Sequence, residues 1–384
     1  METMTWNQQV VKKNNKALVI QLIIQNEPIS RAGIAQISGL HKATVSSLVN
    51  ELLEEDLIFE SGQGESSGGR RPVNLHFNSV AGYAIGIEIG VNHLLCVMTD
   101  LSGTIQFELS EKINCTPFPL ILDKLQKTIQ TLMDSMPASR YGVIGIGVGV
   151  PGIVNKSGSV LLAPNLGWSK IDLKNELESL FNVPVVVENE ANAGAFGEQQ
   201  FGAGESFENI IYISAGIGIG VGIILKKELY QGKNGFSGEV GHMIIELNGK
   251  PCSCGSRGCW EAYASENALL ESANTDSLEA LIEKAREWDE TAISHFEEIG
   301  QYLGYGINNI INTFNPDQVI LGNRLVMAKD WIEQPILNTI ENNTLAYHQN
   351  DLQFNFSELG KYSTALGVSA FVVENFIKGE ARTL

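Results

Sequence analysis

Between residues 238 and 261 the chain places one histidine and three cysteines at a spacing that suits a single metal ion. Cys252, Cys254 and Cys259 follow the pattern C-x-C-x4-C, and His242 lies ten residues before the first cysteine. Thiolate and imidazole are the ligands that tetrahedral zinc prefers, and three cysteines with one histidine are a usual set in closed structural sites. Free or disulfide-bonded cysteines would also fit the spacing, but such clusters in chains without a secretion signal more often bind metal. We therefore predict a structural Zn²⁺ ion bound by these four side chains.

Two carboxylates, Glu239 and Glu261, flank the same histidine and the last cysteine, and zinc does not need them. If one ring nitrogen of His242 binds the ion, the other can only present an N–H group, fixed in direction. A fixed donor between two acceptors suits a polyhydroxylated ligand such as a sugar. Two ordinary solvated glutamates are the alternative, which this stretch alone leaves open.

The length and charge of the chain suggest several domains with different partners. The chain has 384 residues, enough for two or three domains and a large core. Its net charge of −18 argues against a nucleic-acid partner for the chain as a whole. However, residues 1–80 hold seven Lys/Arg and eight Asp/Glu, so the excess of acid lies in the remainder. A near-neutral N-terminal segment can still present a basic face, whereas the acidic body would be repelled by phosphates.

No apolar run approaches the length of a membrane span, and residues 1–8 are polar, without a signal-peptide pattern. We therefore expect a cytoplasmic protein with no membrane partner.

The N-terminal 78 residues carry the pattern of a winged helix-turn-helix. Ser30 can cap a short helix that ends at Gly39, and two short helices joined at a glycine are typical of this motif. The expected helices are residues 8–25, 31–38 and 42–55, and the expected wing strands are residues 57–59 and 73–77. The expected buried stripe of the first helix is Val11, Leu18, Leu22 and Ile23.

The third helix has an apolar face and an opposite face of small or polar side chains that can enter a major groove. The apolar residues are Val45, Leu48, Val49 and Leu52, and the groove-facing residues are Lys42, Ala43, Ser46, Ser47 and Asn50. Thr44 lies at the border, in position for a phosphate. At the wing tip, Arg70 and Arg71 offer two guanidinium groups to backbone phosphate or a narrow minor groove. A small helical bundle that uses the same apolar spacing for dimer contacts is the alternative.

From residue 83 onward, short apolar runs alternate with helical patterns, which predicts an α/β fold. The expected strands are residues 83–90, 94–99, 104–108, 141–150, 184–188, 210–214, 221–225 and 318–321. Expected helices cover about 118–134, the segment after Asn189-Glu190, and about 291–314. The G-I-G-I-G turn at 216–220 has two interpretations, because its backbone N–H groups can cradle phosphate or its glycines can simply permit close packing.

These motifs together resemble the ROK family of bacterial sugar kinases and sugar-responsive repressors, over essentially the whole chain. The resemblance is carried by G-G-R-R-P (68–72), V-P-G (150–152), P-N-L-G-W (164–168), E-N-E-A-N (188–192), G-E-V-G-H (238–242) and C-x-C-G-x-x-G-C-W-E (252–261). It implies an actin-like ATPase architecture, in which a winged helix-turn-helix over 1–78 precedes a sugar-binding and dimerisation body over 79–384. That body would consist of two α/β lobes around a cleft, approximately 79–190 plus the C-terminal helix, and 191–365.

The resemblance also implies which residues contact the sugar. They are Gly152, Asn165, Asn189, Glu190, Glu239, His242 and Glu261, while zinc falls to His242, Cys252, Cys254 and Cys259. No residue is expected to be catalytic, because the chain departs from the kinase pattern in three places. The first phosphate loop of the kinases reads D-x-G-G-T, where this chain has residues 88–92, E-I-G-V-N. A threonine before the second glycine loop is replaced by Ala215, and the catalytic aspartate is replaced by Glu190.

The expected protein is therefore a homodimeric, zinc-stabilised repressor that binds an inverted-repeat operator and releases it when a sugar binds. D-xylose is favoured as the effector on the whole-chain resemblance alone. The alternatives are an ATP-dependent sugar kinase that also binds DNA, a repressor that responds to glucose or another hexose, and a zinc sensor. A closed set of four ligands argues against a sensor, because such sites lack an exchangeable open position.

Overall fold

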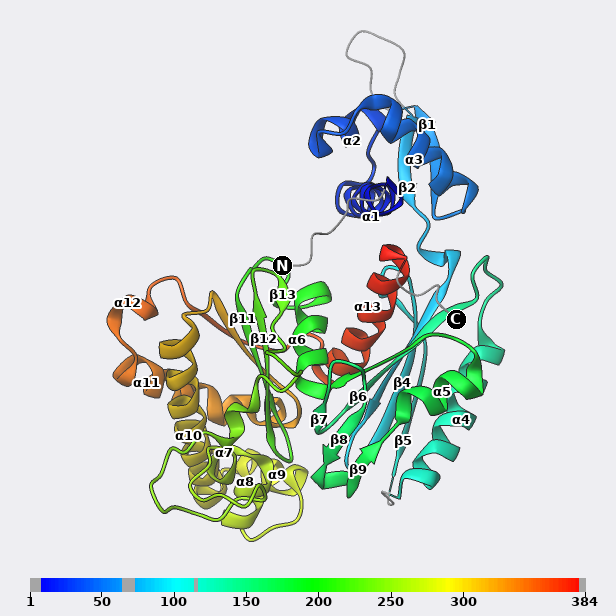
Figure 1. Cartoon of the computed structure of the whole chain (residues 1–384). Helices are drawn as coiled ribbons and strands as arrows, with labels where there is room; N and C mark the ends of the chain where they lie inside the picture. The colour runs from blue at the N-terminus through cyan, green and yellow to red at the C-terminus, as the bar shows by residue number, and fades with distance from the viewer. Residues whose placement is uncertain (1–7, 64–72, 114–116, 380–384) are drawn as a thin grey trace.

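The structure is a computed structural model that describes residues 8–63, 73–113 and 117–379. An N-terminal helical domain is joined to a body with two separate five-stranded sheets (Figure 1). We call the part built on the sheet of residues 83–189 the first lobe, and the part built on the sheet of residues 210–356 the second lobe. The predicted fold class, a helix-turn-helix followed by a two-lobed α/β body, is confirmed.

The N-terminal domain contains the three predicted helices, α1 (Gln8–Asn26), α2 (Arg31–Ser38) and α3 (Lys42–Glu54). The Ser30 side chain accepts a hydrogen bond from the backbone N–H of Gly33, and Gly39 ends α2 with a φ of 69°. This left-handed conformation suits glycine, which carries no Cβ. The predicted apolar face of α3 is buried as expected. The prediction for α1 is wrong at Leu18, which is exposed, and Val11 is only half-buried. The buried stripe is instead Val19, Ile20, Leu22 and Ile23, a face that α1 turns toward α3 and the end of the last helix.

Replacing Ser30 by alanine is expected to lower the free energy of unfolding of this domain by about 1 kcal/mol, the usual cost of a lost N-cap. Hydrogen exchange of the α2 amides in increasing urea measures the loss. Ser30→Asp keeps an acceptor for the Gly33 N–H and should stay close to the wild-type value. An equal loss in both variants would show that the cap is not its cause.

The two wing strands pair antiparallel, as β1 (Ile58–Gln63) and β2 (Val73–Phe77). The first is longer than predicted and begins one residue later. Arg70 and Arg71, predicted at the wing tip, lie outside the described residues.

The first lobe is a mixed sheet in the order β10-β6-β3-β4-β5. Its parallel strands β10, β6 and β3 leave their carboxyl ends at one edge, and β4 and β5 continue antiparallel. The elements are η1 (Ser79–Ala81), β3 (Tyr83–Ile89), β4 (His93–Asp100), β5 (Ile105–Lys112), α4 (Phe118–Ser135), β6 (Val143–Val150), α5 (Leu173–Phe181) and β10 (Val185–Asn189). A small accessory sheet consists of β7 (Ile153–Val154), β8 (Val160–Ala163) and β9 (Trp168–Ile171), with η2 (Pro164–Leu166) before β9.

The second lobe is a mixed sheet in the order β13-β12-β11-β14-β15. Its strands are β11 (Ile210–Ala215), β12 (Ile219–Leu225), β13 (Glu228–Leu229), β14 (Gln318–Gly322) and β15 (Gln353–Phe356). The short helices are η3 (Glu239–His242), α7 (Glu261–Ala264), α8 (Glu266–Ser272), α9 (Leu278–Arg286), η4 (Arg324–Ala328), α12 (Ala346–Gln349) and η5 (Gly360–Tyr362). The longer helices α10 (Glu290–Phe314) and α11 (Lys329–Asn343) pack against each other on the outer side of this lobe (Figure 1).

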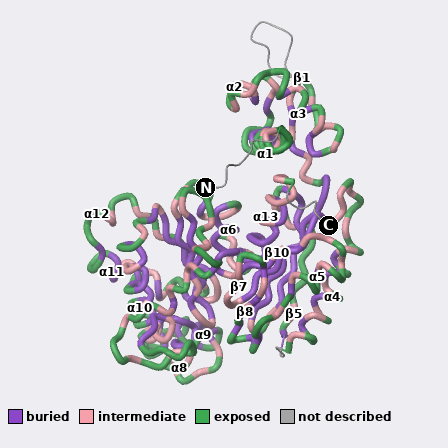
Figure 2. Tube along the Cα trace, in the orientation of Figure 1, coloured by how far each residue is buried: buried purple, intermediate pink, exposed green. Residues whose placement is uncertain are grey.

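Two helices, α6 (Glu190–Phe201) and α13 (Ser363–Lys378), lie between the two sheets (Figure 1). Both are buried over most of their length, as the purple segments at the centre of Figure 2 show. They contact each other through backbone, because a Cβ on Gly367 would lie only 1.8 Å from the carbonyl oxygen of Ala193. Among the described residues, no helix is long and apolar enough to cross a membrane.

Candidate functional site

A cleft of about 500 Å³ opens between the two lobes. The first lobe lines it with the ends of β3 and β10 and with the turns that follow β3 and β6; the second lobe lines it with the turn before β12 and with η3. All seven residues predicted to contact a sugar line this one cleft: Gly152, Asn165, Asn189, Glu190, Glu239, His242 and Glu261. The structure thus brings together side chains from positions 109 residues apart in the sequence.

Asn189 positions the start of α6 at the floor of the cleft. Its Oδ1 accepts hydrogen bonds from the backbone N–H groups of Ala191 and Asn192, at 2.8 and 3.1 Å, which caps the helix. Its Nδ2 donates to the carbonyl oxygen of Gly152 at 2.9 Å. The amide therefore joins two of the predicted contact residues, and its second N–H remains for a ligand.

Glu190 follows directly and carries the most perturbed acid in the cleft. Burial, together with the nearby charge of Glu88, raises the pKa of its carboxyl group to about 7. Its Oε1 accepts a long hydrogen bond of 3.5 Å from the hydroxyl of Ser214. An acid with a pKa near neutrality in a polar cleft is a candidate for ligand contact.

Glu88 and His93 also line the cleft, and the sequence did not point to them as ligand contacts. His93 Nε2 lies 3.3 Å from Glu88 Oε1, and this hydrogen bond raises the pKa of the imidazole. The ring folds back over Gly90, where an added Cβ would lie 2.2 Å from His93 Cε1. The sequence marks Glu88 only as the start of an altered loop. The strands on either side of this turn are predicted from the sequence, but no local pattern reveals that the His93 ring packs back over Gly90 and reaches Glu88.

Arg324 is a further cleft residue from the second lobe, and its guanidinium group is paired with two carboxylates. Its Nε donates to both carboxylate oxygens of buried Glu266, at 3.0 and 2.8 Å, and a terminal nitrogen donates to Glu279 at 3.0 Å. Among the charged groups that line the described cleft, carboxylates therefore outweigh free cations, which favours a neutral hydroxyl-bearing ligand over an anion.

The opposite wall holds Glu239, His242 and Glu261. Glu261 Oε2 accepts a hydrogen bond from the backbone N–H of Ile219 at 3.0 Å, which fixes this carboxylate against the glycine-rich turn. His242 Nε2 lies 3.9 Å from Glu239 Oε2 and so faces the cleft. The other ring nitrogen, Nδ1, lies 3.6 Å from the sulfur of Cys252. The two nitrogens of this ring thus face two different sites.

His242, Cys252, Cys254 and Cys259 form the cluster that the spacing predicted. One ligand atom from each lies within 4.8 Å of all the others. The sulfurs of Cys254 and Cys259 are 3.7 Å apart. Tetrahedral zinc with Zn–S bonds of about 2.3 Å requires sulfur–sulfur separations of roughly 3.8 Å. The donor set and its dimensions therefore fit one metal ion.

The glycine-rich turn at 216–220 joins β11 to β12 as a hairpin. A Cβ on Gly220 would lie 2.9 Å from the Cβ of Ala191. Of the two interpretations left open by the sequence, close packing of α6 on β12 accounts for Gly220. Gly222, two residues beyond the turn in β12, packs in the same way, since its Cβ would lie 2.3 Å from the Ala191 carbonyl oxygen.

On α3, the residues predicted to face DNA lie away from the buried face. Lys42, Ala43, Thr44, Ser47 and Asn50 are exposed, and Ser46 is half-buried. Asn50 Oδ1 accepts a hydrogen bond of 3.2 Å from Arg31, whose guanidinium also pairs with Glu60 at 2.6 Å. This contact engages the carbonyl oxygen of Asn50 rather than its amide N–H₂ group.

Comparison with known proteins supplies a whole-chain context. The model of the ROK family matches residues 84–375. The xylose repressor of Bacillus spizizenii is 45% identical over 375 residues, which cover 97% of this chain and 98% of that protein. A crystal structure of a ROK family transcriptional regulator, a homolog of the E. coli MLC protein, superposes with a TM-score of 0.84 at 28% identity and covers 96% of this chain and 98% of its own. A ROK family glucokinase from Streptomyces griseus, in complex with glucose and AMPPNP, has a TM-score of 0.69 at 28% identity and covers 76% of this chain and 99% of its own.

Proposed function

The chain belongs to the ROK family, and from this premise we propose that it is a sugar-responsive transcriptional repressor that D-xylose releases from its operator. The observation that carries the proposal is the reach of the match to a xylose repressor, which covers the helix-turn-helix as well as the cleft. We assign DNA binding to residues 1–78, and sugar binding and dimerisation to residues 79–384.

The polar side chains that line the cleft suit a sugar bound between the lobes. Asn189 and Glu190 offer a donor and an acceptor from the floor, and Glu239, His242 and Glu261 offer a donor between two acceptors from the second lobe. Gly152 and Asn165 complete the set from the accessory sheet side. A sugar that contacts both lobes favours the closed form only by its higher affinity for that form.

Zinc is the metal that fits the cluster of His242, Cys252, Cys254 and Cys259. The ion would be structural, because four protein ligands leave no open position. With Nδ1 of His242 directed at the cluster, the ring proton is on Nε2. The Nε2–H group then donates a hydrogen bond toward the cleft. The metal site thus orients a sugar donor rather than taking part in chemistry.

A sugar kinase is the second candidate, favoured by the likeness of the body to a ROK glucokinase. Against it, the His93 ring packs over Gly90 and pairs with Glu88 in the loop that departs from the kinase pattern. Incubation with labelled ATP and a panel of aldoses distinguishes the two, since a repressor forms no sugar phosphate. Turnover at an ordinary kinase rate would reject the proposal.

The operator would be an inverted repeat read by the two recognition helices of a homodimer. Direct readout is assigned to Lys42, Ala43, Ser46, Ser47 and Asn50, and phosphate contact to Thr44, Arg70 and Arg71. Titration of a labelled operator fragment, with and without D-xylose, tests the function. Release by D-xylose supports it, and equal binding in both conditions rejects it.

Lys42→Ala is expected to relax the preference for one base pair of each half-site by about 1–3 kcal/mol, because a lost base contact removes that discrimination. Binding to a library of single-base operator variants measures the change. Lys127→Ala, on exposed α4 of the body, is the control and should leave the preference unaltered. An unchanged preference in Lys42→Ala would show that the recognition face is misplaced.

A further inference from the structure

The last helix, α13, touches the floor of the cleft at its beginning. The hydroxyl of Thr364 donates to the backbone carbonyl oxygen of Glu190 at 3.4 Å. The same side chain fills the space above Gly149, where an added Cβ would lie 2.3 Å from Thr364 Cγ2. Thr364 thus lies against both β6 and the first residue of α6.

Along its first half, α13 is in backbone contact with α6. A Cβ on Gly197 would lie 2.3 Å from the carbonyl oxygen of Ser363, and one on Gly367 would lie 1.8 Å from that of Ala193. At these glycine positions no side chain lies between the helices to absorb a shift. A displacement of the first turn of α6 therefore displaces α13 as well.

At its other end, α13 packs against the N-terminal helical domain. Val372 and Val373 belong to the same buried cluster as the cores of α1 and α3. Phe376 packs edge-on against Tyr141, with ring centroids 5.0 Å apart and an interplanar angle of 74°. The Tyr141 hydroxyl donates to the backbone carbonyl oxygen of Glu55 at 2.9 Å, and Glu55 is the residue that ends the recognition helix.

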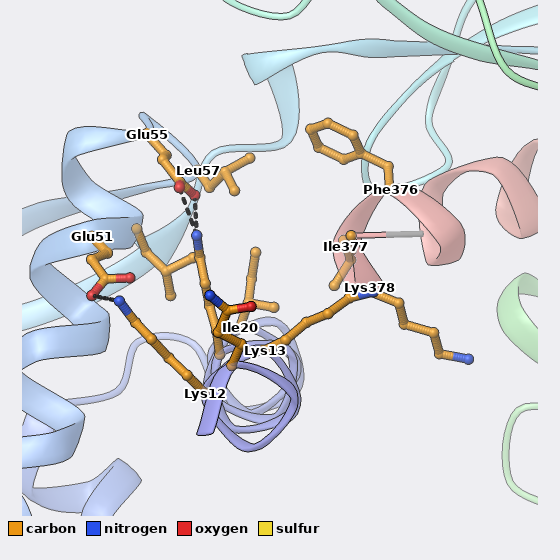
Figure 3. A pocket seen from close by; sticks show the side chains of 13 residues that line it. Lys12, Lys13, Ile20, Glu51, Glu55, Leu57, Phe376, Ile377 and Lys378 are labelled. Atoms are coloured by element: carbon orange, nitrogen blue, oxygen red, sulfur yellow. Dashed lines mark hydrogen bonds and ion pairs between the residues drawn. The ribbon is translucent and has the colours of Figure 1, made fainter. Parts of the chain in front are cut away.

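The seam between the two parts contains a cavity of about 350 Å³, bounded by α1, α3 and the end of α13. Figure 3 shows Phe376 and Ile377 on one side of it and Ile20 and Leu57 on the other. The cavity leaves room for the end of α13 to move at this seam. The Phe376–Tyr141 contact and the bond from Tyr141 to Glu55 keep that movement joined to α3.

We infer that α13 carries the effect of sugar binding from the cleft to the recognition helix, with Thr364 as a positioning residue at the cleft and the Phe376–Tyr141 pair as positioning residues at α3. The inference rests on the proposed function, because it names the path by which an occupied cleft weakens operator binding. None of the three side chains needs to touch the sugar or the DNA.

The test measures three constants in each variant: the Kd for D-xylose alone, the Kd for the operator alone, and the operator Kd at saturating D-xylose. In the wild type, sugar should raise the operator Kd by about 5- to 150-fold, the usual range of allosteric coupling. In Phe376→Ala the ratio of the operator Kd with sugar to the operator Kd without sugar should fall toward one. The Kd for D-xylose alone should stay within about twofold of wild type. Tyr141→Phe keeps the ring pair and loses the bond to Glu55, so its ratio should fall partway.

Phe376→Leu is the control for misfolding, because it restores apolar volume at the seam. The increase in operator Kd caused by sugar should be partly recovered in this variant. Phe118→Leu is the matched control, since Phe118 packs edge-on against Trp168 at 5.3 Å in the first lobe, away from this path. A full wild-type ratio in Phe376→Ala would overturn the role of α13 while leaving the repressor function intact. If saturating D-xylose left the operator Kd of the wild type unchanged, the proposed function would be rejected, and this inference with it.

Discussion

A Cys254→Ser protein is expected to keep its fold, lose its zinc and bind D-xylose about 2- to 12-fold more weakly, the equivalent of one hydrogen bond between neutral groups. Cys254 is exposed, so the substitution opens no cavity in the core. Three remaining ligands cannot close a tetrahedral site. His242 then loses the metal ion that would hold its Nδ1. Its Nε2–H group is no longer fixed toward the cleft.

Metal analysis of the purified protein and calorimetry with D-xylose measure the two effects, and circular dichroism checks the fold. Ser256→Ala is the matched control, because Ser256 is an exposed neighbour in the same loop that supplies no metal ligand. Zinc loss with unchanged sugar affinity would show that the metal site does not orient a sugar donor. Retention of one zinc per chain would show that the ligand set is wrong.

A Glu190→Gln protein is expected to bind D-xylose about 10- to 150-fold more weakly at pH 8, because a hydrogen bond to a charged acceptor is lost. Since the pKa of Glu190 is about 7, the wild-type carboxyl group is mostly ionised at pH 8 and mostly protonated at pH 6. Wild-type affinity should therefore rise from pH 6 to pH 8. The glutamine variant, which does not titrate, should lack this rise.

The same pKa has an opposite consequence for the sugar-free fold. A carboxyl group whose pKa rises from 4.5 to about 7 on folding contributes stability below pH 4.5 that is lost as the pH rises through 7. This contribution to stability is at most about 3 kcal/mol. Water in the cleft reduces it, because the Glu190 side chain is only half-buried. The free energy of unfolding of the wild type in urea, relative to that of Glu190→Gln, should therefore fall from pH 5 to pH 8. Glu205→Gln, at an exposed turn, is the control, and flat profiles for both proteins would contradict the raised pKa.

Much of the fold follows from local sequence patterns. Ser30 and Gly39 mark the ends of α2 because capping and a left-handed φ depend on one or two residues. The metal cluster also follows from spacing, since three of its ligands lie within eight residues on one short loop. Such features need no knowledge of distant segments.

Features that depend on packing between distant segments were missed. The burial of Val19 in place of Leu18 follows from how α1 packs on α3 and α13, which sequence periodicity does not specify. The Glu88–His93 pair depends on the turn after β3, and the pKa of Glu190 depends on burial between two lobes. The contact of α13 with the helix-turn-helix joins segments at opposite ends of the chain. In each case the missing information was tertiary.

Calorimetric titration of D-xylose into the protein, alone and saturated with an operator fragment, tests the central claim most directly. Linkage requires that operator DNA weaken sugar binding by the same factor by which sugar weakens operator binding. We expect the Kd for D-xylose to rise by that factor when DNA is present. An identical sugar Kd with and without the operator would mean that the cleft and the helix-turn-helix act independently, and would contradict the account.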